Sequence, residues 1–327
     1  MTRVAVIGAG VMGSAAAWAL SARGAEVTLY EQFELDHDRG SSHGRTRIVR
    51  LSYPEAHWVE LARASLEAWR DLEVDAGQEL LHLHGLVELA PSRDLTSASG
   101  LDACGVDYRW LDREGARALG AELPDGWVAL EQPEAGVVRA DHARHAFLEV
   151  AIARGARVEA GTRVASVDDA DADVVVVTAG PWIRELVPDV PVTVTRETIA
   201  YFRHEGEPLR AIVELDEITR GHGIYALHDP VHGVKAGEHH GGPVAEPGAG
   251  GEPDLESVGH VAAWVAARLP GVDPEPVDPQ TCLYTSTADG SFVLERRGRV
   301  VVGSACSGHG FKFAPVVGRR LADLALG

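Results

Sequence analysis

The fold is decided by the stretch Arg3-Val-Ala-Val-Ile-Gly8-Ala-Gly10-Val-Met-Gly13, near the start of this chain of 327 residues. A short apolar strand runs directly into a Gly-x-Gly-x-x-Gly motif, and residues 14–23 continue it as a predicted helix. Gly8 suits a tight turn, Gly10 lets the backbone approach a pyrophosphate, and Gly13 lets the helix pack closely on the strand. The start of such a helix attracts anions through its unpaired N–H groups and dipole. The pattern therefore predicts a dinucleotide-binding unit.

The residues after this helix complete the unit. Gly24 is placed to end the helix, and residues 25–30 form a second apolar strand that leads to Glu31. An acid roughly twenty residues beyond the motif is expected to bind a ribose hydroxyl. A carboxylate at this position disfavours a 2′-phosphate, which argues against NADP. The unit by itself does not choose between NAD and FAD.

The composition is that of a globular protein, with 45% hydrophobic and 24% charged residues. This length allows two domains, or one large domain with an inserted layer. The formal net charge of -19 at pH 7 repels the phosphates of nucleic acids and anionic membranes. We therefore expect neither as a partner, and an anionic substrate would need a local cluster of Arg and Lys.

Cysteines and histidines predict neither a disulfide framework nor a metal site. The cysteines, an odd number at wide spacing, are Cys104, Cys282 and Cys306. The clustered histidines, which no cysteine or carboxylate set frames, are His232, His239 and His240. No apolar run reaches the roughly 18 residues of a membrane span, and the chain begins with a strand rather than a signal peptide. We expect a soluble protein of the cytoplasm.

The middle of the chain resumes the nucleotide-binding part and then changes character. Helices are predicted over 57–73 and 140–154, with strands over 156–160 and 173–178. The Val-rich run at 173–178 is typical of a strand buried on both faces of a parallel sheet. Shorter, more polar strands follow at 192–196 and 198–202, which indicates an inserted antiparallel sheet.

The last third of the chain returns to the nucleotide-binding part. A surface loop is predicted over 241–253 and a helix over 256–269. Strands then follow at 281–287, 291–294 and 300–304, and a closing helix spans 315–326.

Three further segments carry a resemblance to a known family. They are residues 40–50 (GSSHGRTRIVR), 282–285 (CLYT) and 303–312 (GSACSGHGFK). Together with the N-terminal unit they resemble the D-amino-acid oxidase superfamily of FAD-dependent oxidoreductases, most closely the branch of monomeric sarcosine oxidase and N-methyltryptophan oxidase. The resemblance covers both ends of the chain and, weakly, its middle.

The resemblance implies an α/β fold of two domains. A Rossmann-type FAD-binding domain would comprise residues 1–80, 137–186 and 287–327. A mostly antiparallel substrate domain would comprise residues 81–136 and 187–286. The relatives also imply a monomer.

The implied cofactor is FAD, attached through its 8α carbon to the thiol of Cys282. A lone cysteine in a strand is more often a small buried hydrophobe, but Tyr284 and the 303–312 segment follow at the family's spacing. His43 and Arg47 would lie beside the flavin ring. The expected FAD contacts are Gly8, Gly10, Val11, Met12, Gly13, Glu31, Gln32, Ser41, Ser42, His43, Thr46, Arg47, Val164, Ala179, Gly180, Trp182, Cys282, Ser307, Gly308, His309, Gly310, Phe311 and Lys312.

The substrate residues are also carried over from the family. Arg50 and Lys312 match the pair that holds a substrate carboxylate, although Arg50 alone is also compatible with a solvated charge at a strand edge. Lys235 matches a lysine that activates O2 on the opposite flavin face. The expected catalytic residues are Arg47, Tyr225, Lys235, His239 and Tyr284, where Tyr225 matches only with a gap of one residue.

Two departures bear on the substrate. Arg45 stands where the relatives usually carry an acid, and Cys306 stands where they carry an aromatic residue. A cysteine at position 306 either enlarges the pocket or merely repacks the strand end.

The expected activity is oxidation of the C–N bond of a secondary amine or N-substituted amino acid. Hydride would pass to the flavin, and O2 would be reduced to H2O2. One alternative is a tailoring oxidase or dehydrogenase that desaturates a cyclic imino acid or a larger biosynthetic amine. The other is a flavin-binding redox protein without turnover.

Overall fold

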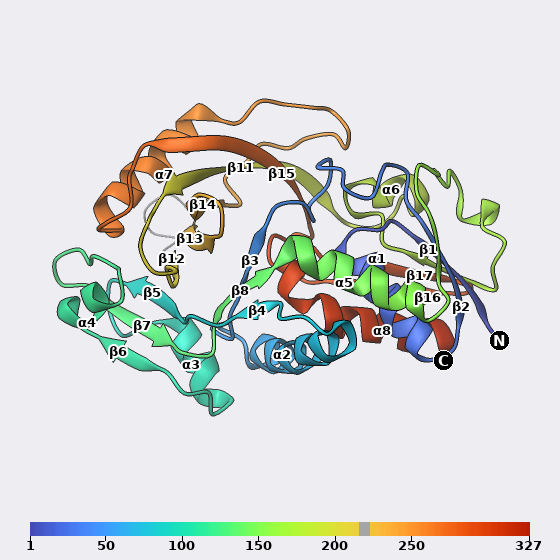
Figure 1. Ribbon diagram of the computed structural model, residues 1–327, viewed down its shortest axis with the longest axis horizontal. Coiled ribbons are helices and arrows are strands. Elements are labelled where there is room, and N and C mark those ends of the chain that lie inside the picture. Colours follow the sequence, from blue (N-terminus) through green and yellow to red (C-terminus); the bar gives the residue numbers. More distant parts are fainter. Residues whose placement is uncertain (216–222) are drawn as a thin grey trace.

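A computed structural model describes residues 1–215 and 223–327 (Figure 1). The N-terminal strand β1 lies inside a sheet of six strands drawn from both ends and the middle of the chain, in the order β16-β17-β10-β1-β2-β9. All neighbours are parallel except the β16–β17 pair. These strands are β1 (Arg3–Ile7), β2 (Glu26–Tyr30), β9 (Arg157–Glu159), β10 (Val174–Val177), β16 (Val293–Arg297) and β17 (Val300–Ser304).

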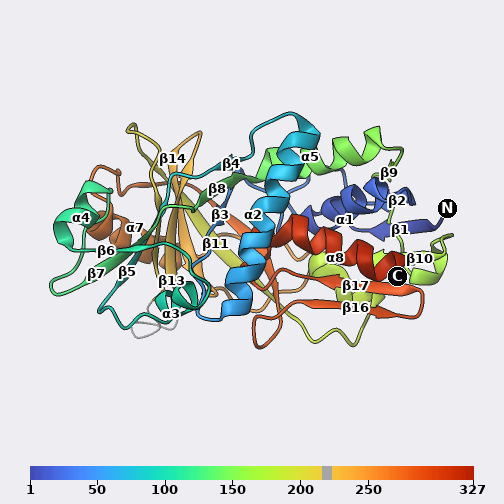
Figure 2. The ribbon, with the colours of Figure 1, turned by 90° about the horizontal axis from the view of Figure 1, so that it is seen from below.

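Helices cover this parallel sheet because the apolar side chains of the strands and of the helices must be buried against another layer. Helix α1 (Val11–Ala22) packs between α5 (Ala140–Ala153) and α8 (Ala314–Leu326), and Figure 2 shows α1 and α8 side by side. Their close approach depends on Gly318, where a Cβ would lie 2.5 Å from the carbonyl oxygen of Ala15. Helix α2 (Ala56–Ala76) packs against α8 and α5, and Figure 2 shows it running across the middle of the molecule.

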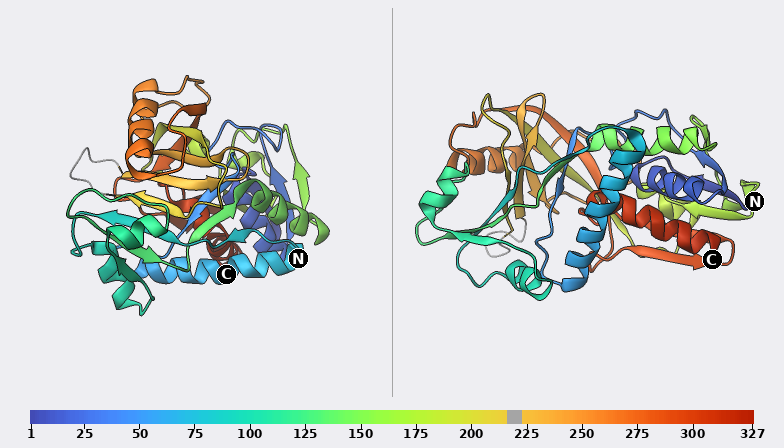
Figure 3. Two further views of the ribbon diagram at one scale, coloured as in Figure 1. Left: turned by 60° about the vertical axis from the view of Figure 1, so that its left-hand side comes forward. Right: turned by 60° about the horizontal axis from the view of Figure 1, so that its bottom comes forward.

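A second sheet of eight strands lies at the other end of the molecule, as both views of Figure 3 show. Its order is β15-β11-β14-β13-β12-β5-β7-β6, and only β5 and β12 pair in parallel. Helix α7 (Leu255–Arg268) packs on it. Its strands are β5 (Leu86–Ala90), β6 (Arg109–Leu111), β7 (Val128–Gln132), β11 (Thr193–Arg203), β12 (Ala211–Glu214), β13 (Gly223–Asp229), β14 (Gly233–His239) and β15 (Pro276–Ser286). The predicted fold, a Rossmann-type part with a mostly antiparallel inserted sheet, is confirmed.

A small sheet joins the two parts. Its order is β3 (Thr46–Val49), β8 (Gly136–Arg139) and β4 (Leu81–His82). It therefore takes strands from both sides of the predicted boundaries, and the division into two domains stays a prediction. The remaining short helices are α3 (Thr96–Ala103), α4 (Arg113–Ala118), α6 (Ile183–Leu186), η1 (Val167–Asp169), η2 (Gly180–Trp182) and η3 (Gly310–Phe313). No helix within the described residues is long and apolar enough to span a membrane.

The predicted break between two strands at 192–196 and 198–202 is wrong. One continuous strand, β11, runs through it. The residue between the two predicted strands, Glu197, is buried at 1% exposure. Its carboxylate accepts hydrogen bonds from the Thr195 hydroxyl at 2.5 Å and from the backbone N–H of Gly242 at 3.0 Å. A charged residue can occupy a buried strand when such partners satisfy it.

We predict that Gly13→Ala lowers the free energy of unfolding by about 1–3 kcal/mol, the usual cost of overpacking. A Cβ at Gly13 would lie 1.9 Å from the carbonyl oxygen of Gly8, so α1 would have to move away from β1. The control is Gly259→Ala on α7, where a Cβ meets nothing within 4 Å, and which should gain about 0.5–1 kcal/mol. Urea denaturation measures both, and equal stability of the two variants would refute the packing role of Gly13.

Candidate functional site

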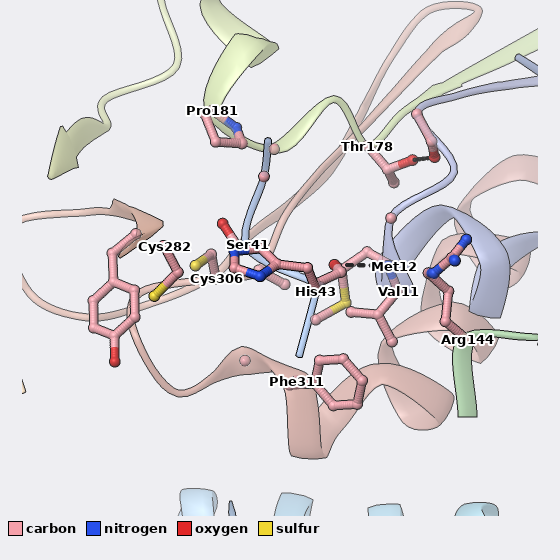
Figure 4. A pocket seen from close by; sticks show the side chains of 18 of the residues that line it. Val11, Met12, Ser41, His43, Arg144, Thr178, Pro181, Cys282, Cys306 and Phe311 are labelled. Atoms are coloured by element: carbon pink, nitrogen blue, oxygen red, sulfur yellow. Dashed lines mark hydrogen bonds between the residues drawn. The ribbon is translucent and has the colours of Figure 1, made fainter. Parts of the chain in front are cut away.

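A cavity extends from the carboxyl ends of β1 and β2 to the inner face of the eight-stranded sheet. The glycine motif and Glu31 line one part, which we call the nucleotide end. Cys282, Tyr284 and Lys235 line the other part, which we call the sheet end. Figure 4 shows Val11 and Met12 at the start of α1, with Cys282 and Cys306 farther along the cavity.

The nucleotide end places the start of helix α1 beside an ionised acid. The N-cap of α1, Gly10, offers no side-chain cap, and the Val11 N–H donates to the Ser42 hydroxyl at 3.0 Å. Glu31 is 5% exposed and accepts hydrogen bonds from the Ala9 N–H at 2.8 Å and the Phe33 N–H at 3.1 Å. Burial raises the pKa of Glu31, but hydrogen bonds from His37 and from these two N–H groups lower it below its ordinary value.

The whole chain contains two lysines, Lys235 and Lys312, and both line the cavity. They are 4% and 3% exposed. Neither forms an ion pair with a carboxylate in the part of the chain that the structure describes. Unpaired buried cations are costly, so the cavity is built to receive negative charge.

Lys235, on β14, lies beside the loop that precedes β3. Its Nζ donates to the carbonyl oxygen of Thr46 at 3.4 Å. Arg47 is turned toward the same loop, and its Nη2 donates to the carbonyl oxygens of Ser41 at 2.9 Å and His43 at 2.5 Å. Burial, and then the charge of Arg47, lowers the pKa of Lys235 to about 7. A nearby anion would restore its positive charge.

Lys235 is expected to lose its proton near pH 7 in the ligand-free protein, so its charge is present below this pH and absent above it. Protonated Lys235 is disfavoured in the folded state, so this group adds stability as pH rises from about 7 toward its ordinary pKa of 10.5. Labelling with [13Cε]lysine gives two side-chain resonances, which Lys312→Met assigns. A titration of Lys235 above pH 9 would contradict the expected burial effect.

His43 carries a polar atom without a partner. Burial, followed by the charge of Arg47, lowers the pKa of His43 to about 4, so its imidazole is neutral at pH 7. Its Nε2 is buried and has no hydrogen-bond partner among the described residues. Such orphaned atoms are rare in folded proteins and indicate a missing ligand or water.

Cys282 brings a thiol into the sheet end. Burial raises the pKa of the Cys282 thiol, while the charges of Arg47 and Lys235 act in the opposite direction. Cys306 lines the same part of the cavity, where its sulfur accepts from the backbone N–H of Thr285 at 3.4 Å. Figure 4 shows the two thiols near His43.

Arg50 and Lys312 meet at Tyr53. Lys312 Nζ donates to the Tyr53 hydroxyl at 2.9 Å and to the carbonyl oxygen of His309 at 2.8 Å. The Arg50 guanidinium lies 4.7 Å from the centre of the Tyr53 ring, and Arg50 donates to the carbonyl oxygen of Ser52. Burial, and then Arg50, holds the pKa of Lys312 well below its usual range. Two like charges held together match one carboxylate.

Neutral hydrogen-bonding groups line the cavity near these cations. The rings of His239 and Tyr284 are 5.8 Å apart. Burial, and then His240, lowers the pKa of His239, while burial raises the pKa values of Tyr225 and Tyr284. At pH 7 the imidazole is therefore neutral and both phenols keep their protons. Tyr225 lies opposite Gly237 in the β13–β14 pair and lines the cavity, as its gapped match required.

The structure brings nearly all predicted site residues to the cavity wall. Three predicted cofactor contacts lie outside the lining: Gly13, Thr46 and Ser307. Gly13 is covered by the Gly8 carbonyl, and Thr46 presents its carbonyl group to Lys235 rather than its hydroxyl. The Ser307 hydroxyl is used between the Thr287 N–H and the Ser291 carbonyl, both at 3.3 Å. These three residues have structural partners in the ligand-free protein, and the cofactor and substrate roles of all the predicted site residues stay predictions.

Arg45, which stands where the relatives usually carry an acid, forms an ion pair with a carboxylate from a distant strand. It forms a two-bond pair with Asp229 on β13, with Nε at 2.8 Å and Nη2 at 3.1 Å. Asp229 is fully buried. Burial raises its pKa, but the hydrogen bond from Arg45 lowers it below its ordinary value. The pair ties the loop before β3 to the sheet that carries Lys235.

Sequence reasoning missed two parts of the lining. One is Arg144 on α5, which no motif marks. The other is an apolar wall at the sheet end, made of Ile48, Val213, Leu215 and Leu227. Apolar residues in these segments are typical of strands, but the sequence does not indicate which face of each strand lines a cavity.

Comparisons with known proteins agree with this geometry. The DAO family model, described as FAD dependent oxidoreductase, matches residues 3–324. The chain is 31% identical to a probable sarcosine oxidase of Arabidopsis thaliana, over 99% of this chain and 88% of the relative. It is 29% identical to an N-methyl-L-tryptophan oxidase of Yersinia pestis, over 98% and 94%. Among solved structures, it is similar to NikD, an unusual amino acid oxidase essential for nikkomycin biosynthesis, with a TM-score of 0.86, 26% identity, and 100% and 94% coverage.

Proposed function

The chain belongs to the DAO family of FAD-dependent oxidoreductases, and from this premise we propose that it oxidises the C–N bond of an N-substituted amino acid with O2 as electron acceptor. The observation that carries the proposal is the pair of basic side chains, Arg50 and Lys312, which form no ion pair within the described residues and pack on one tyrosine beside neutral hydrogen-bonding groups. A carboxylate on the substrate supplies the missing negative charge. The C–N bond is then placed beside the Cys282 part of the cavity.

The residues present fit FAD. A Cβ at Gly10 would lie 3.2 Å from the Ser42 hydroxyl, so the helix start can be approached closely only without a side chain. Glu31 suits the ribose hydroxyls, and the orphaned Nε2 of His43 suits a polar ring atom. When bound, FAD supplies the acceptor for hydride from the substrate carbon and transfers the electrons to O2, which becomes H2O2.

The chain's own residues bind and orient the amine. Arg50 and Lys312 hold the carboxylate, and their charges are strong here because the site is buried. His239 is neutral and can accept a hydrogen bond from an amine N–H, whereas burial and the nearby basic groups Arg50 and Lys312 disfavour the protonated amine. Tyr225 and Tyr284 remain protonated and limit the space around the substituent. Orientation of this kind supplies a large part of the rate of enzymatic reactions.

Lys235 acts in the second half of the reaction. Its ammonium group, which is buried in the cavity wall, stabilises the negative charge that develops as O2 is reduced. Arg47 lies beside the same loop and supports the developing charge. The Arg45–Asp229 pair fixes this loop, so that the Thr46 carbonyl oxygen keeps Lys235 in place.

Covalent attachment of FAD through Cys282 gives a direct prediction. After acid precipitation, yellow colour should stay with the pellet of the natural protein and move to the supernatant in Cys282→Ala. Cys306→Ala is the matched control, because its thiol lines the same part of the cavity. Absorbance spectra of pellet and supernatant give the measurement. If the Cys282→Ala pellet keeps its colour and the Cys306→Ala pellet loses it, the link is to Cys306 and the prediction is wrong.

The activity itself is tested by adding N-methyl and cyclic amino acids to the yellow protein, first without O2 and then with it. Bleaching of the flavin by one of them, followed by H2O2 formation, is the expected result. A yellow protein that none of these amines bleaches would refute the proposal and favour the alternative of a redox protein without turnover. Location in the cytoplasm and a monomeric state stay predictions.

A second candidate, oxidation of a cyclic imino acid or a larger biosynthetic amine, is favoured by one observation. The wall formed by Ile48, Val213, Leu215 and Leu227 is apolar, and Cys306 stands where a larger ring was expected. Sarcosine has no side chain that such a wall would bind. The likeness to NikD, described as an unusual amino acid oxidase, supports the same direction. A higher kcat/KM for a bulky cyclic substrate than for sarcosine would select this candidate.

A further inference from the structure

We infer that Arg144, on helix α5, binds the pyrophosphate of the dinucleotide together with the start of α1. The inference rests on the proposed function in that it takes FAD as the ligand of the cavity. It adds a cationic residue that lies far from the glycine motif along the chain and that no sequence motif indicates.

The first support is the state of the Arg144 side chain. The residue is 8% exposed. Its Nη2 donates to Asp36 Oδ1 at 2.6 Å, whereas its Nη1 is buried and has no hydrogen-bond partner among the described residues. An arginine cannot shed its charge, so a buried N–H group without an acceptor is costly. An anion in the cavity would remove that cost.

The second support is where the guanidinium lies. Arg144 lines the cavity together with Gly10, Val11 and Met12, and Figure 4 shows it beside Val11 and Met12. Helix α1 has no side-chain cap and no acidic residue in its first turn. Its first N–H groups therefore lack partners inside the helix and carry the positive end of the helix dipole. Arg144 and the first residues of α1 therefore line the same end of the cavity, where, of these helix N–H groups, only that of Val11 has a side-chain partner, the Ser42 hydroxyl, among the described residues.

The third support is the distribution of charge along the cavity. Four lining cations, Arg47, Arg50, Lys235 and Lys312, belong to the sheet end. At the nucleotide end, Arg163 also lines the cavity, but its side chain is 63% exposed and pairs with Glu185 at 2.8 Å. Arg144 is thus the buried cation on the nucleotide side. A pyrophosphate is the doubly charged part of a dinucleotide, and arginine matches phosphate oxygens with its planar fork.

Asp36 and His145 hold the guanidinium in this orientation. Asp36 Oδ1 contacts Arg144 Nη2 and also His145 Nε2, the latter at 2.8 Å. The hydrogen bond from His145, and then Arg144, lowers the pKa of Asp36. Because Asp36 engages Nη2, the free edge of the guanidinium is the Nη1 edge. We therefore regard Asp36 as a positioning residue for Arg144.

The test uses the full-length chain with Cys282→Ala, so that FAD binds reversibly, and compares it with the same chain carrying Arg144→Gln. Calorimetry with FAD, ADP, FMN and adenosine gives the dissociation constants. We expect FAD and ADP to bind about 10- to 100-fold more weakly to Arg144→Gln, the usual effect of losing a hydrogen bond to a charged group. FMN and adenosine lack the pyrophosphate, so their binding should change by less than about twofold.

Two further variants complete the test. Arg163→Gln removes an exposed arginine from the same end and should leave FAD binding within about twofold, which separates a specific contact from general charge. Arg144→Lys keeps the positive charge but lacks the planar fork of the guanidinium, so its affinity for FAD should lie between those of the parent chain and Arg144→Gln. It also replaces Arg144→Gln in the test if that variant does not fold.

Unchanged FAD and ADP binding in both Arg144 variants would overturn the inference while leaving the proposed function intact. Equal losses for adenosine and ADP would also overturn it, because they would assign Arg144 to the nucleoside. A parent chain that binds none of the flavins would overturn the proposed function together with the inference.

Discussion

Lys235→Met should slow reoxidation of the flavin by O2 about 100- to 1,000-fold, the range observed when a single stabilising donor is removed from an active site. Methionine keeps the length of the side chain and removes its charge. Lys235 lies on β14, is 4% exposed, and donates to the Thr46 carbonyl oxygen, its one hydrogen-bond partner among the described residues. Reduction by the amine should change by less than about threefold, because the substrate cations are elsewhere in the cavity.

Stopped-flow absorbance separates the two half-reactions. The amine is first mixed with the enzyme without O2, and the bleached enzyme is then mixed with O2. The control is Lys312→Met, the same substitution at the chain's other lysine. It should slow reduction by the amine and leave reoxidation by O2 largely unchanged. An equal slowing of both half-reactions by Lys235→Met would sink the assigned role, since a general disturbance of the cavity would then explain the loss.

The second large effect concerns the carboxylate. Arg50→Ala and Lys312→Met should each lower kcat/KM for an N-methyl amino acid about 30- to 1,000-fold, the usual cost of removing one partner of a buried charge pair. The corresponding amine without the carboxylate should be oxidised equally by all three proteins. Both side chains contact Tyr53, and neither forms an ion pair within the described residues, although the charge of Arg50 also acts on the buried carboxyl group of Glu88. A substrate carboxylate would therefore meet two basic groups that no ion pair engages.

The ratio of kcat/KM for the two substrates is therefore the decisive measurement, because it cancels losses of folding or flavin content. Arg163→Gln, on the exposed edge of the nucleotide end, is the matched control and should keep the natural ratio. If the variants lose both substrates in the same proportion, Arg50 and Lys312 do not read the carboxylate. An Arg50→Lys variant should retain part of the ratio, since it keeps charge without the two-bond geometry.

The elements that the sequence predicted well are those whose signals are local. The strand before Gly8, the helix after Gly10 and the acid at Glu31 lie within one short segment, and the structure places them as expected. The break predicted within β11 is wrong because Glu197 can lie buried inside the strand. Its carboxylate accepts a hydrogen bond from Gly242, which belongs to a loop distant in the sequence. Local pattern contains no information about such a partner.

The site divides in the same way. The sequence by itself determined the nucleotide-binding unit. Through its resemblance to a family it also singled out Cys282, Lys235 and Lys312, which the structure places in the cavity wall. Only the tertiary structure decided that Arg144, with an unpartnered Nη1, lines the cavity together with the start of α1, and that Asp229 pairs with Arg45. A motif records residues that neighbour one another along the chain. Charge pairing and burial depend instead on which distant segments the packing of sheets and helices brings together.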